Sequence, residues 1–246
     1  YVLALALRAL KPEAPLTALA PNEKGGTRLA KELAAFGCDV AAESKRHHRI
    51  CRTARPGVLN EGAVTEAIEG GQPRFADDLG QWTQPGVFSW DAHDTGTLLL
   101  ISALPTLAGH GADLGCGIGL LAAAVLANPD VTHLDLIDID RRAVVAAKRN
   151  IADKRAAFHW ADARVAPALN DLDFVVMNPP FHDAGIENKS LGQAFVRRAY
   201  KILRPGGTLW MVANRHLPYE GAMLSLFART DLRAEGHGFK VYEACK

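Results

Sequence analysis

The sequence has 246 residues, of which 48% are hydrophobic and 22% are charged, with a formal net charge of +1. These values predict a globular protein with room for one large α/β domain and a smaller unit. No apolar run reaches 18 residues, and the opening segment lacks a basic leader and a cleavage site, so we expect no membrane span and a cytoplasmic protein.

The cysteines argue against a zinc site built on thiolates. Cys38, Cys51, Cys116 and Cys245 are far apart in the sequence and form no CxxC or Cys/His spacing suited to zinc. We therefore expect reduced thiols and no bound metal. The near-zero net charge disfavours a nucleic-acid-binding protein, because such domains often carry a large positive excess.

The first 55 residues predict a small α/β N-terminal unit. The patterns of apolar and turn residues place helices at 2–10 and 27–35 and strands at 16–20, 39–42 and 49–53. Residues 56–84 are rich in glycine, proline, glutamine and acids without sustained periodicity, so we interpret them as a linker and docking segment.

The segment 45–55 is strongly basic. It contains Arg46, Arg49 and Arg52 together with a further lysine and arginine, and it has no acidic residue. Two interpretations stay open. The segment is either a solvated edge strand that its charges protect against aggregation, or a patch that contacts RNA phosphates through these three arginines.

From Asp94 onward, strands and helices alternate. Helices are predicted at 95–104, 118–126, 141–151 and 191–203, and strands at 111–114, 133–139, 156–160, 173–177, 208–213, 232–235 and 239–244. This alternation predicts a mostly parallel, doubly wound α/β sheet with helices on both faces. Ligands of such sheets bind at the carboxyl ends of the strands, so we expect the functional residues there.

A glycine-rich turn follows the strand at 111–114. Its residues Asp113, Gly115, Cys116, Gly117 and Gly119 open the next helix, and glycines let backbone N–H groups approach a ligand closely. The turn differs from a phosphate-binding loop, because an aspartate precedes it and no Lys-Ser/Thr follows it. Asp113 would repel a pyrophosphate, so we expect a nucleoside with a cationic tail.

Acidic residues end the next two strands. Asp138 lies about 25 residues after Asp113, near the spacing at which an acid accepts both ribose hydroxyls, and Ile139 follows it. We expect Asp140 to cap the following helix instead of contacting the ligand. Asp162, with Ala163 beside it, ends the third strand and can accept a hydrogen bond from an adenine amino group.

The fourth strand ends at Asn178-Pro179-Pro180-Phe181. The prolines restrict the backbone, so the Asn178 side-chain oxygen and the Pro179 carbonyl form a rigid pair of acceptors. Such a pair can hold the two hydrogens of an exocyclic amine, and Phe181 can stack on an unpaired base. The alternative is a plain β-turn with a core phenylalanine.

These motifs together resemble the small-subunit ribosomal RNA guanine-N2 methyltransferases, which carry a class I domain called the methyltransferase small domain. The likeness spans about residues 75–246 and includes PGVFSWDAHDTG (85–96), DLGCGIG (113–119), NPPFHD (178–183), LRPGGTL (203–209), VAN (212–214), LPY (217–219) and FKVY (239–242). The resemblance implies a seven-stranded class I sheet in residues 85–246, S-adenosyl-L-methionine as cofactor, and ribosomal RNA or a small-subunit particle as partner. It also implies that Phe88, Asp94 and Gly96 help to close the cofactor pocket, with Phe88 on the substrate side.

Members of this family usually carry a full N-terminal domain, a degenerate copy of the methyltransferase fold. Residues 1–55 resemble only its closing part, with residues 20–26 in the place of its last degenerate loop. Two other functions remain open. The same Asn-Pro-Pro turn suits a methyltransferase that acts on a glutamine side-chain amide in a protein, and the fold alone would serve a catalytically silent RNA-binding scaffold.

Overall fold

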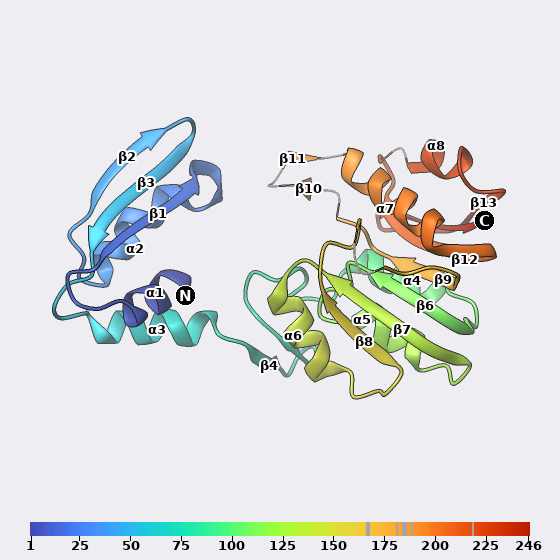
Figure 1. Cartoon of the computed structure of the whole chain (residues 1–246), viewed down its shortest axis with the longest axis horizontal. Helices are drawn as coiled ribbons and strands as arrows, with labels where there is room; N and C mark the ends of the chain where they lie inside the picture. The colour runs from blue at the N-terminus through green and yellow to red at the C-terminus, as the bar shows by residue number, and fades with distance from the viewer. Residues whose placement is uncertain (166–167, 181, 184–185, 188, 218) are drawn as a thin grey trace. The chain divides into compact units, whose positions relative to one another are not determined.

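The computed structural model describes the whole chain except residues 166–167, 181, 184–185, 188 and 218 (Figure 1). The chain forms two compact units, Tyr1–Gln72 and Pro73–Lys246. In the part that is described, no helix is long and apolar enough to cross a membrane.

The N-terminal unit packs three helices and a three-stranded sheet around one small core. The helices are α1 (Val2–Ala9), α2 (Leu29–Ala35) and α3 (Glu61–Gly71), the strands are β1 (Pro15–Pro21), β2 (Ala41–Lys45) and β3 (His48–Ala54), and two 3-10 turns, η1 (Asn22–Lys24) and η2 (Gly26–Arg28), follow β1. The strands are antiparallel, in the order β1-β3-β2. Helix and strand residues such as Leu7, Leu33, Cys51 and Val64 are fully buried in the core.

Residues 56–72, which the sequence suggests are part of a linker, group with the N-terminal unit. Asn60 caps α3 by accepting a hydrogen bond from the Ala63 N–H at 3.3 Å, and Val64 is buried in the core. Three glycines within α3 weaken its helical pattern. The helix is therefore stabilised mainly by packing, which residue propensities do not reveal.

The C-terminal unit contains the seven-stranded sheet that the sequence predicts. Its strands are β6 (Gly109–Leu114), β7 (Val131–Asp138), β8 (Ala156–Trp160), β9 (Leu172–Met177), β12 (Leu203–Asn214), β13 (Arg229–Gly236) and β14 (Phe239–Cys245), in the order β13-β14-β12-β9-β6-β7-β8. The five strands from β12 to β8 in this order are parallel, and β14 runs antiparallel to both of its neighbours. The chain reverses its direction of travel across the sheet at β6, so a ligand crevice is expected at the carboxyl end of β6.

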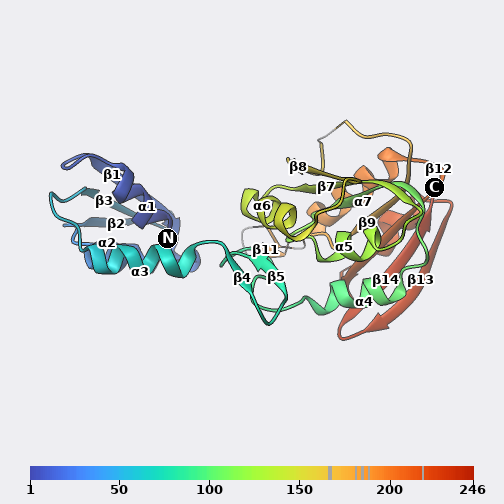
Figure 2. The same cartoon turned by 90° about the horizontal axis from the view of Figure 1, so that it is seen from below.

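Helices cover both faces of this sheet (Figure 1, Figure 2). On one face, α4 (Thr95–Ala103), α5 (Leu120–Leu126) and α6 (Arg141–Asn150) pack against strand residues that include Leu134, Phe174 and Trp210. On the other face, α7 (Lys189–Ile202) and α8 (Tyr219–Leu224) pack against alternate residues such as Leu114 and Val175. These two layers of core hold the strand ends in fixed positions.

Two short hairpins complete the unit. Strands β4 (Arg74–Ala76) and β5 (Gln81–Thr83) pair with each other, as do β10 (His182–Asp183) and β11 (Ile186–Glu187). The Asn150 side chain at the end of α6 accepts from the Trp82 N–H at 2.7 Å and donates to the Trp82 carbonyl at 2.9 Å. The first hairpin is thereby docked on the C-terminal unit, although its sequence gives no strand pattern.

Candidate cofactor and substrate site

The glycine-rich turn after β6 adopts a backbone that favours glycine at three positions. Gly115, Gly117 and Gly119 have φ values of 84°, 54° and 93°, all in the left-handed region. A Cβ at Gly119 would lie 2.8 Å from the Ile151 Cδ1 atom, so a larger residue there would also require the Ile151 side chain to shift. The turn separates two pockets, and Gly115 lines both of them.

The first pocket is built around the carboxylate of Asp113, the next-to-last residue of β6. Asp113 is 1% exposed, and neither of its carboxylate oxygens has a hydrogen-bond donor within the described part of the chain. Burial and the nearby Asp138 carboxylate raise the pKa of Asp113 to about 8. An orphaned buried acceptor of this kind costs about 1–3 kcal/mol unless a ligand supplies the donor. The pocket therefore fits a ligand with a cationic, hydrogen-bond-donating group.

The same pocket contains a second unpartnered polar atom, which sequence reasoning missed. His93 Nε2 is buried without a hydrogen-bond partner among the described residues, and His93 lines the pocket beside Asp113. Phe88, expected on the substrate side, also lines this pocket and is 58% exposed. The only sequence signal for His93 was its place inside the 85–96 motif.

Asp138 ends β7 and holds the glycine turn in place. Its two carboxylate oxygens accept hydrogen bonds from the Gly117 N–H at 2.9 Å and the Asp140 N–H at 2.8 Å. Burial raises the pKa of Asp138, although these two backbone donors act in the opposite direction. Each oxygen keeps a second lone pair, so the carboxylate can still accept hydroxyl groups of a ligand in the second pocket, which it lines.

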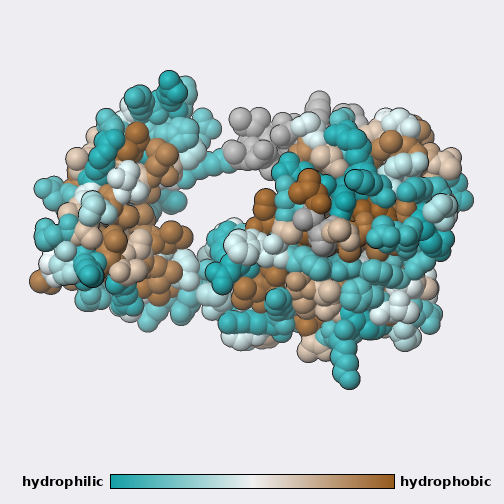
Figure 3. Space-filling model, in the orientation of Figure 1, coloured by the Kyte–Doolittle hydropathy of each residue, from teal (hydrophilic) through white to brown (hydrophobic). Residues whose placement is uncertain are grey.

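The second pocket contains the other residues expected at the strand ends. Asp138, Ile139, Asp162, Ala163 and Pro180 line it. Apolar residues are visible on the surface of the C-terminal unit (Figure 3). Ile139 is one of the large apolar residues that are exposed, at 68%. An exposed apolar residue beside acceptors suits a stacked, hydrogen-bonded base.

Two of the acids are already engaged by arginines. Asp140 caps α6, as expected, by accepting from the Arg142 N–H at 2.9 Å, and its carboxylate pairs with the Arg142 guanidinium at 2.6 Å. Asp162 pairs with the Arg164 guanidinium at 2.6 Å, which lowers the pKa of Asp162. Asp162 is therefore an ionised acceptor at the edge of the second pocket.

The Asn178 side chain has a defined orientation at the end of β9. Its Nδ2 donates to the Asp94 Oδ2 atom at 2.8 Å and to the Thr97 Oγ1 atom at 2.9 Å. A carboxylate can only accept, so the amide NH2 group must face Asp94 and the Asn178 Oδ1 atom must point the other way. Asn178 lines the first pocket. The network thus leaves an acceptor oxygen available next to the Asp113 pocket.

Asp94 is fixed in turn by the start of α4. Its Oδ2 atom caps the helix by accepting from the Thr97 N–H at 2.7 Å and from the Thr97 hydroxyl at 3.0 Å. A Cβ at Gly96 would lie 2.8 Å from the Phe239 ring, so this glycine allows the last strand to approach α4. The sequence implied Asp94 and Gly96 as cofactor-pocket residues but missed Thr97, whose place three residues after a helix cap was the available signal.

The Asn-Pro-Pro-Phe turn is only partly described. Pro179 is buried and Pro180 is exposed. The position of a Cβ on Gly115 would lie 4.0 Å from both the Asn178 carbonyl oxygen and Pro180, so the turn lies against the glycine loop. Phe181 lies outside the described residues, and its stacking role stays a prediction.

The basic segment 45–55 does not form one surface patch. Strand β3 is the central strand of its sheet, so the interpretation as an edge strand is wrong. Arg46 lies in the two-residue turn between β2 and β3, with φ of 48°. Arg49 and Arg52 are three residues apart on β3 and therefore point to opposite faces. Arg52 pairs with Glu43 at 2.7 Å, Arg49 is half-buried, and Arg46 is exposed.

Taken together, the two pockets present complementary chemistry on the C-terminal unit. Asp113 offers a buried carboxyl group that a cationic ligand would ionise, Asp138 and Asp162 offer carboxylate acceptors, and Asn178 offers a neutral acceptor oxygen. These residue types suit a nucleoside with a cationic tail beside an amine that carries two hydrogens.

Comparisons with known proteins agree with this geometry. The family model described as "Methyltransferase small domain" matches residues 78–243. Curated proteins named "Ribosomal RNA small subunit methyltransferase C" from Shewanella halifaxensis and Shewanella pealeana are 34% and 32% identical to the chain, and each alignment covers 100% of the chain and 73% of the relative.

The fold of the chain is also similar to that of a solved methyltransferase structure. It is described as the T. thermophilus 16S rRNA N2 G1207 methyltransferase in complex with AdoMet and guanosine. It has a TM-score of 0.79 and 25% sequence identity, and the comparison covers 99% of this chain and 68% of that one. The chain therefore belongs to the family of small-subunit ribosomal RNA methyltransferases that carry the methyltransferase small domain.

Proposed function

We propose that this protein transfers a methyl group from S-adenosyl-L-methionine to the exocyclic N2 amine of a guanine in ribosomal RNA. One observation carries the proposal: the Asn178 amide is oriented by Asp94 and Thr97 so that its oxygen is left as an acceptor beside the Asp113 pocket. The names of the relatives and the guanosine in the related T. thermophilus structure support guanine in small-subunit ribosomal RNA as the substrate.

The cofactor fits the residues of the two pockets. Asp113 would accept from its ammonium group, the turn from Gly115 to Gly119, including Cys116, would contact it through the backbone, and Asp138 would accept its ribose hydroxyls. Asp162 would accept from its adenine amino group, with Ile139 and Ala163 against the ring. When bound, S-adenosyl-L-methionine supplies a methyl group on a positively charged sulfur, which reacts without a strong base.

The substrate amine would be held by the Asn-Pro-Pro turn. The Asn178 Oδ1 atom and the Pro179 carbonyl accept its two hydrogens, which directs the nitrogen lone pair toward the cofactor side of the pocket. As the new bond forms, the nitrogen becomes more acidic and its hydrogen bonds to these acceptors strengthen. The extra proton then leaves to solvent. Phe181 would stack on the base after it has left the RNA helix.

The N-terminal unit would add contacts to RNA phosphates. Arg46, in the exposed turn between β2 and β3, is best placed for this among the three arginines expected to bind RNA. Arg52 can contact an RNA phosphate only if its ion pair with Glu43 opens. Exposed ion pairs of this kind contribute at most about 1 kcal/mol, so opening costs little. The substrate would be small-subunit RNA, free or in an assembled particle.

The test is to incubate the full chain with tritiated S-adenosyl-L-methionine and either in vitro transcribed small-subunit RNA or small-subunit particles, then to digest the RNA and separate the nucleosides. We expect label in N2-methylguanosine, and labelling that is slower by about 100-fold or more with the Asn178→Ala variant. Label in protein glutamine, or no transfer to RNA or particles while the cofactor still binds, would contradict the proposal.

A further inference from the structure

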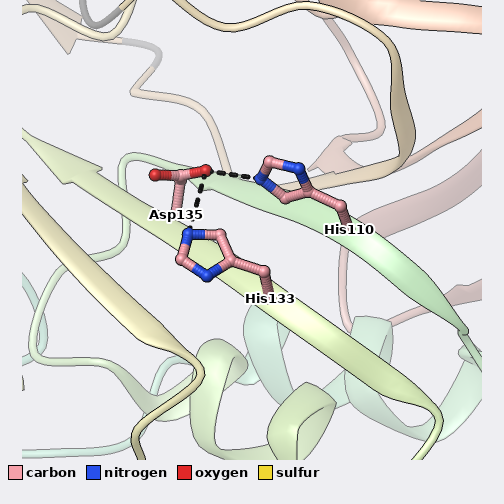
Figure 4. A group of neighbouring side chains, drawn as sticks. All are labelled: His110, His133 and Asp135. Atoms are coloured by element: carbon pink, nitrogen blue, oxygen red, sulfur yellow. Dashed lines mark hydrogen bonds and ion pairs between the residues drawn. The ribbon is translucent and has the colours of Figure 1, made fainter.

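Histidine side chains gather around one carboxylate on the sheet of the C-terminal unit, and Figure 4 shows two of them, His110 and His133, directed at Asp135. None of these three residues lines either pocket. His110 lies on β6, His133 and Asp135 lie on β7, and His159 lies on β8. His110 is paired directly with His133, and Asp135 follows two residues later, so these side chains share one face. The face is the one on which α7 packs farther along the sheet.

The distances bring three possible metal ligands together. The Asp135 Oδ2 atom is 2.7 Å from His110 Nε2 and 3.6 Å from His133 Nε2, and all three ligand atoms lie within 4.8 Å of one another. Around a tetrahedral zinc ion with bonds of about 2.0–2.1 Å, ligand atoms are about 3.4 Å apart. To reach that geometry the side chains must rotate, and His110 Nε2 must release to solvent the proton that it donates to Asp135.

His159 holds the carboxylate in position. Its Nε2 atom is 2.6 Å from Asp135 Oδ1, the oxygen that the other two imidazoles do not approach. The Asp135 side chain is 6% exposed, whereas the three histidine side chains are 30–41% exposed. The carboxylate is therefore buried and oriented, yet an ion can reach it from solvent between the imidazoles.

Hydrogen bonding alone accounts for only part of this arrangement. His110 and His159 each bond one oxygen of Asp135, which satisfies the buried carboxylate. His133 is a third imidazole directed at an oxygen that His110 already occupies, and its 3.6 Å distance is too long for a hydrogen bond. The His110 and His133 rings also meet edge to face, with centroids 4.8 Å apart. The His133 ring nitrogen is thus directed at the carboxylate without a hydrogen bond to it, in a position to share an ion with His110 and Asp135.

We propose that His110, His133 and Asp135 bind a divalent ion of the zinc class, with His159 as the partner that orients the carboxylate and a water at the fourth position. Imidazole and carboxylate ligands suit zinc, and a second hydrogen-bonded residue behind a ligand is common in such sites. The ion would join β6 to β7. Asp113 lies three residues after His110 on β6, and Asp138 lies three residues after Asp135 on β7, so the ion would lie about 10 Å from the pocket acids. Its role is to fix the two strands, not to take part in methyl transfer.

The test uses the tag-free, metal-stripped full chain. We expect one equivalent of Zn2+ to bind in calorimetry, and Co2+ to give the intense visible bands of a four-coordinate site. At a zinc concentration about 100 times the Kd, the melting temperature reported by tryptophan fluorescence should rise by about 5–10 °C. All four tryptophans lie in the C-terminal unit, so this signal reports the part that holds the cluster.

The sharpest variant is His133→Gln, because His133 makes no hydrogen bond to Asp135 in the absence of metal. It should keep the melting temperature of the metal-free protein while its zinc affinity falls by tenfold or more, and Asp135→Asn should lose the cobalt spectrum. His237→Asn, in the exposed turn between β13 and β14, is the matched control and should bind like the unaltered chain. The proposal is overturned if the unaltered chain binds neither ion, or if His133→Gln and Asp135→Asn bind both as tightly as the control.

Discussion

The Asn178 amide nitrogen donates to the Asp94 carboxylate across 2.8 Å, and this contact joins the substrate side of the site to the cap of α4. If the contact orients the amide, Asp94→Asn should permit the amide to flip, because asparagine offers a donor as well as an acceptor. We expect kcat to fall by about 10- to 100-fold with little change in cofactor affinity. Steady-state kinetics with a calorimetric Kd would check this. Thr97→Ser keeps the hydroxyl and should retain most of the activity. If Thr97→Ser lost as much kcat as Asp94→Asn, the loss would point to damage of α4 instead of a flipped amide.

Asp138→Ala should weaken binding of S-adenosyl-L-methionine by about 1–3 kcal/mol, because it removes a charged acceptor of two hydroxyls. It also removes the acceptor of the Gly117 N–H, so part of the loss comes from a looser glycine turn. Calorimetry measures the change. Asp140→Ala is the control, since Asp140 caps α6 and should cost about 1 kcal/mol of stability but no cofactor affinity. If Asp138→Ala bound the cofactor with unaltered affinity, Asp138 would not be a cofactor-binding residue.

The raised pKa of Asp113 predicts how stability depends on pH. Between the unfolded pKa of about 3.9 and the folded pKa of about 8, the folded protein keeps a proton that the unfolded chain has lost. Without cofactor, stability should therefore fall as pH rises from 4 to 8, by up to about 1.4 kcal/mol per pH unit from this group. Urea unfolding followed by tryptophan fluorescence would measure it, and Asp113→Asn should flatten this part of the profile. A profile that Asp113→Asn leaves unchanged would contradict the assignment.

The same proton predicts a signature of cofactor binding. A cationic group next to Asp113 favours the ionised carboxylate, so binding at pH 7 should release close to one proton. Calorimetry in buffers of different ionisation enthalpy counts that proton. If Asp113→Asn still bound the cofactor with the same proton release, the released proton would come from another group.

RNA binding should depend on the turn between β2 and β3. Arg46→Gln should reduce the slope of log K against log salt by about one unit, because each lost phosphate contact removes one released counterion. Arg52→Gln should have a smaller effect, since Arg52 pairs with Glu43. Arg28→Gln, an exposed arginine outside the basic segment, is the control. If Arg46→Gln and the control give the same slope of log K against log salt, Arg46 does not contact an RNA phosphate.

The sequence predicts the sheet well because strand-to-helix alternation and residue periodicity act locally. Asp113, Asp138 and Asn178 are recognisable because each follows a clear apolar strand. Helix α3 and the β4–β5 hairpin are not recognisable, because α3 depends on packing of Val64 and the hairpin on the Asn150 side chain, 68 residues from Trp82. The opposite faces of Arg49 and Arg52 already follow from the predicted strand at 49–53, but the central place of β3 depends on its pairing with β1 and β2, which no local pattern encodes.

The histidine cluster shows the same limit. His110 and Asp135 are 25 residues apart and have no metal-binding spacing, so the expectation of no metal site rested on the cysteines alone. Their proximity depends on the register of β6 against β7, which pairs His110 with His133. Register between parallel strands is set by the packing of the whole sheet, and no short motif encodes it.

Single-turnover methyl transfer at saturating cofactor and RNA tests the central claim most directly. Asn178→Ala removes one of the two acceptors that hold the amine, and it should slow the chemical step by about 100-fold or more while cofactor affinity changes little. The Asn178→Ala rate should be rescued neither by more cofactor nor by more RNA. Transfer by Asn178→Ala at the rate of the unaltered chain would mean that the Asn-Pro-Pro turn is structural, and it would contradict the proposed mechanism.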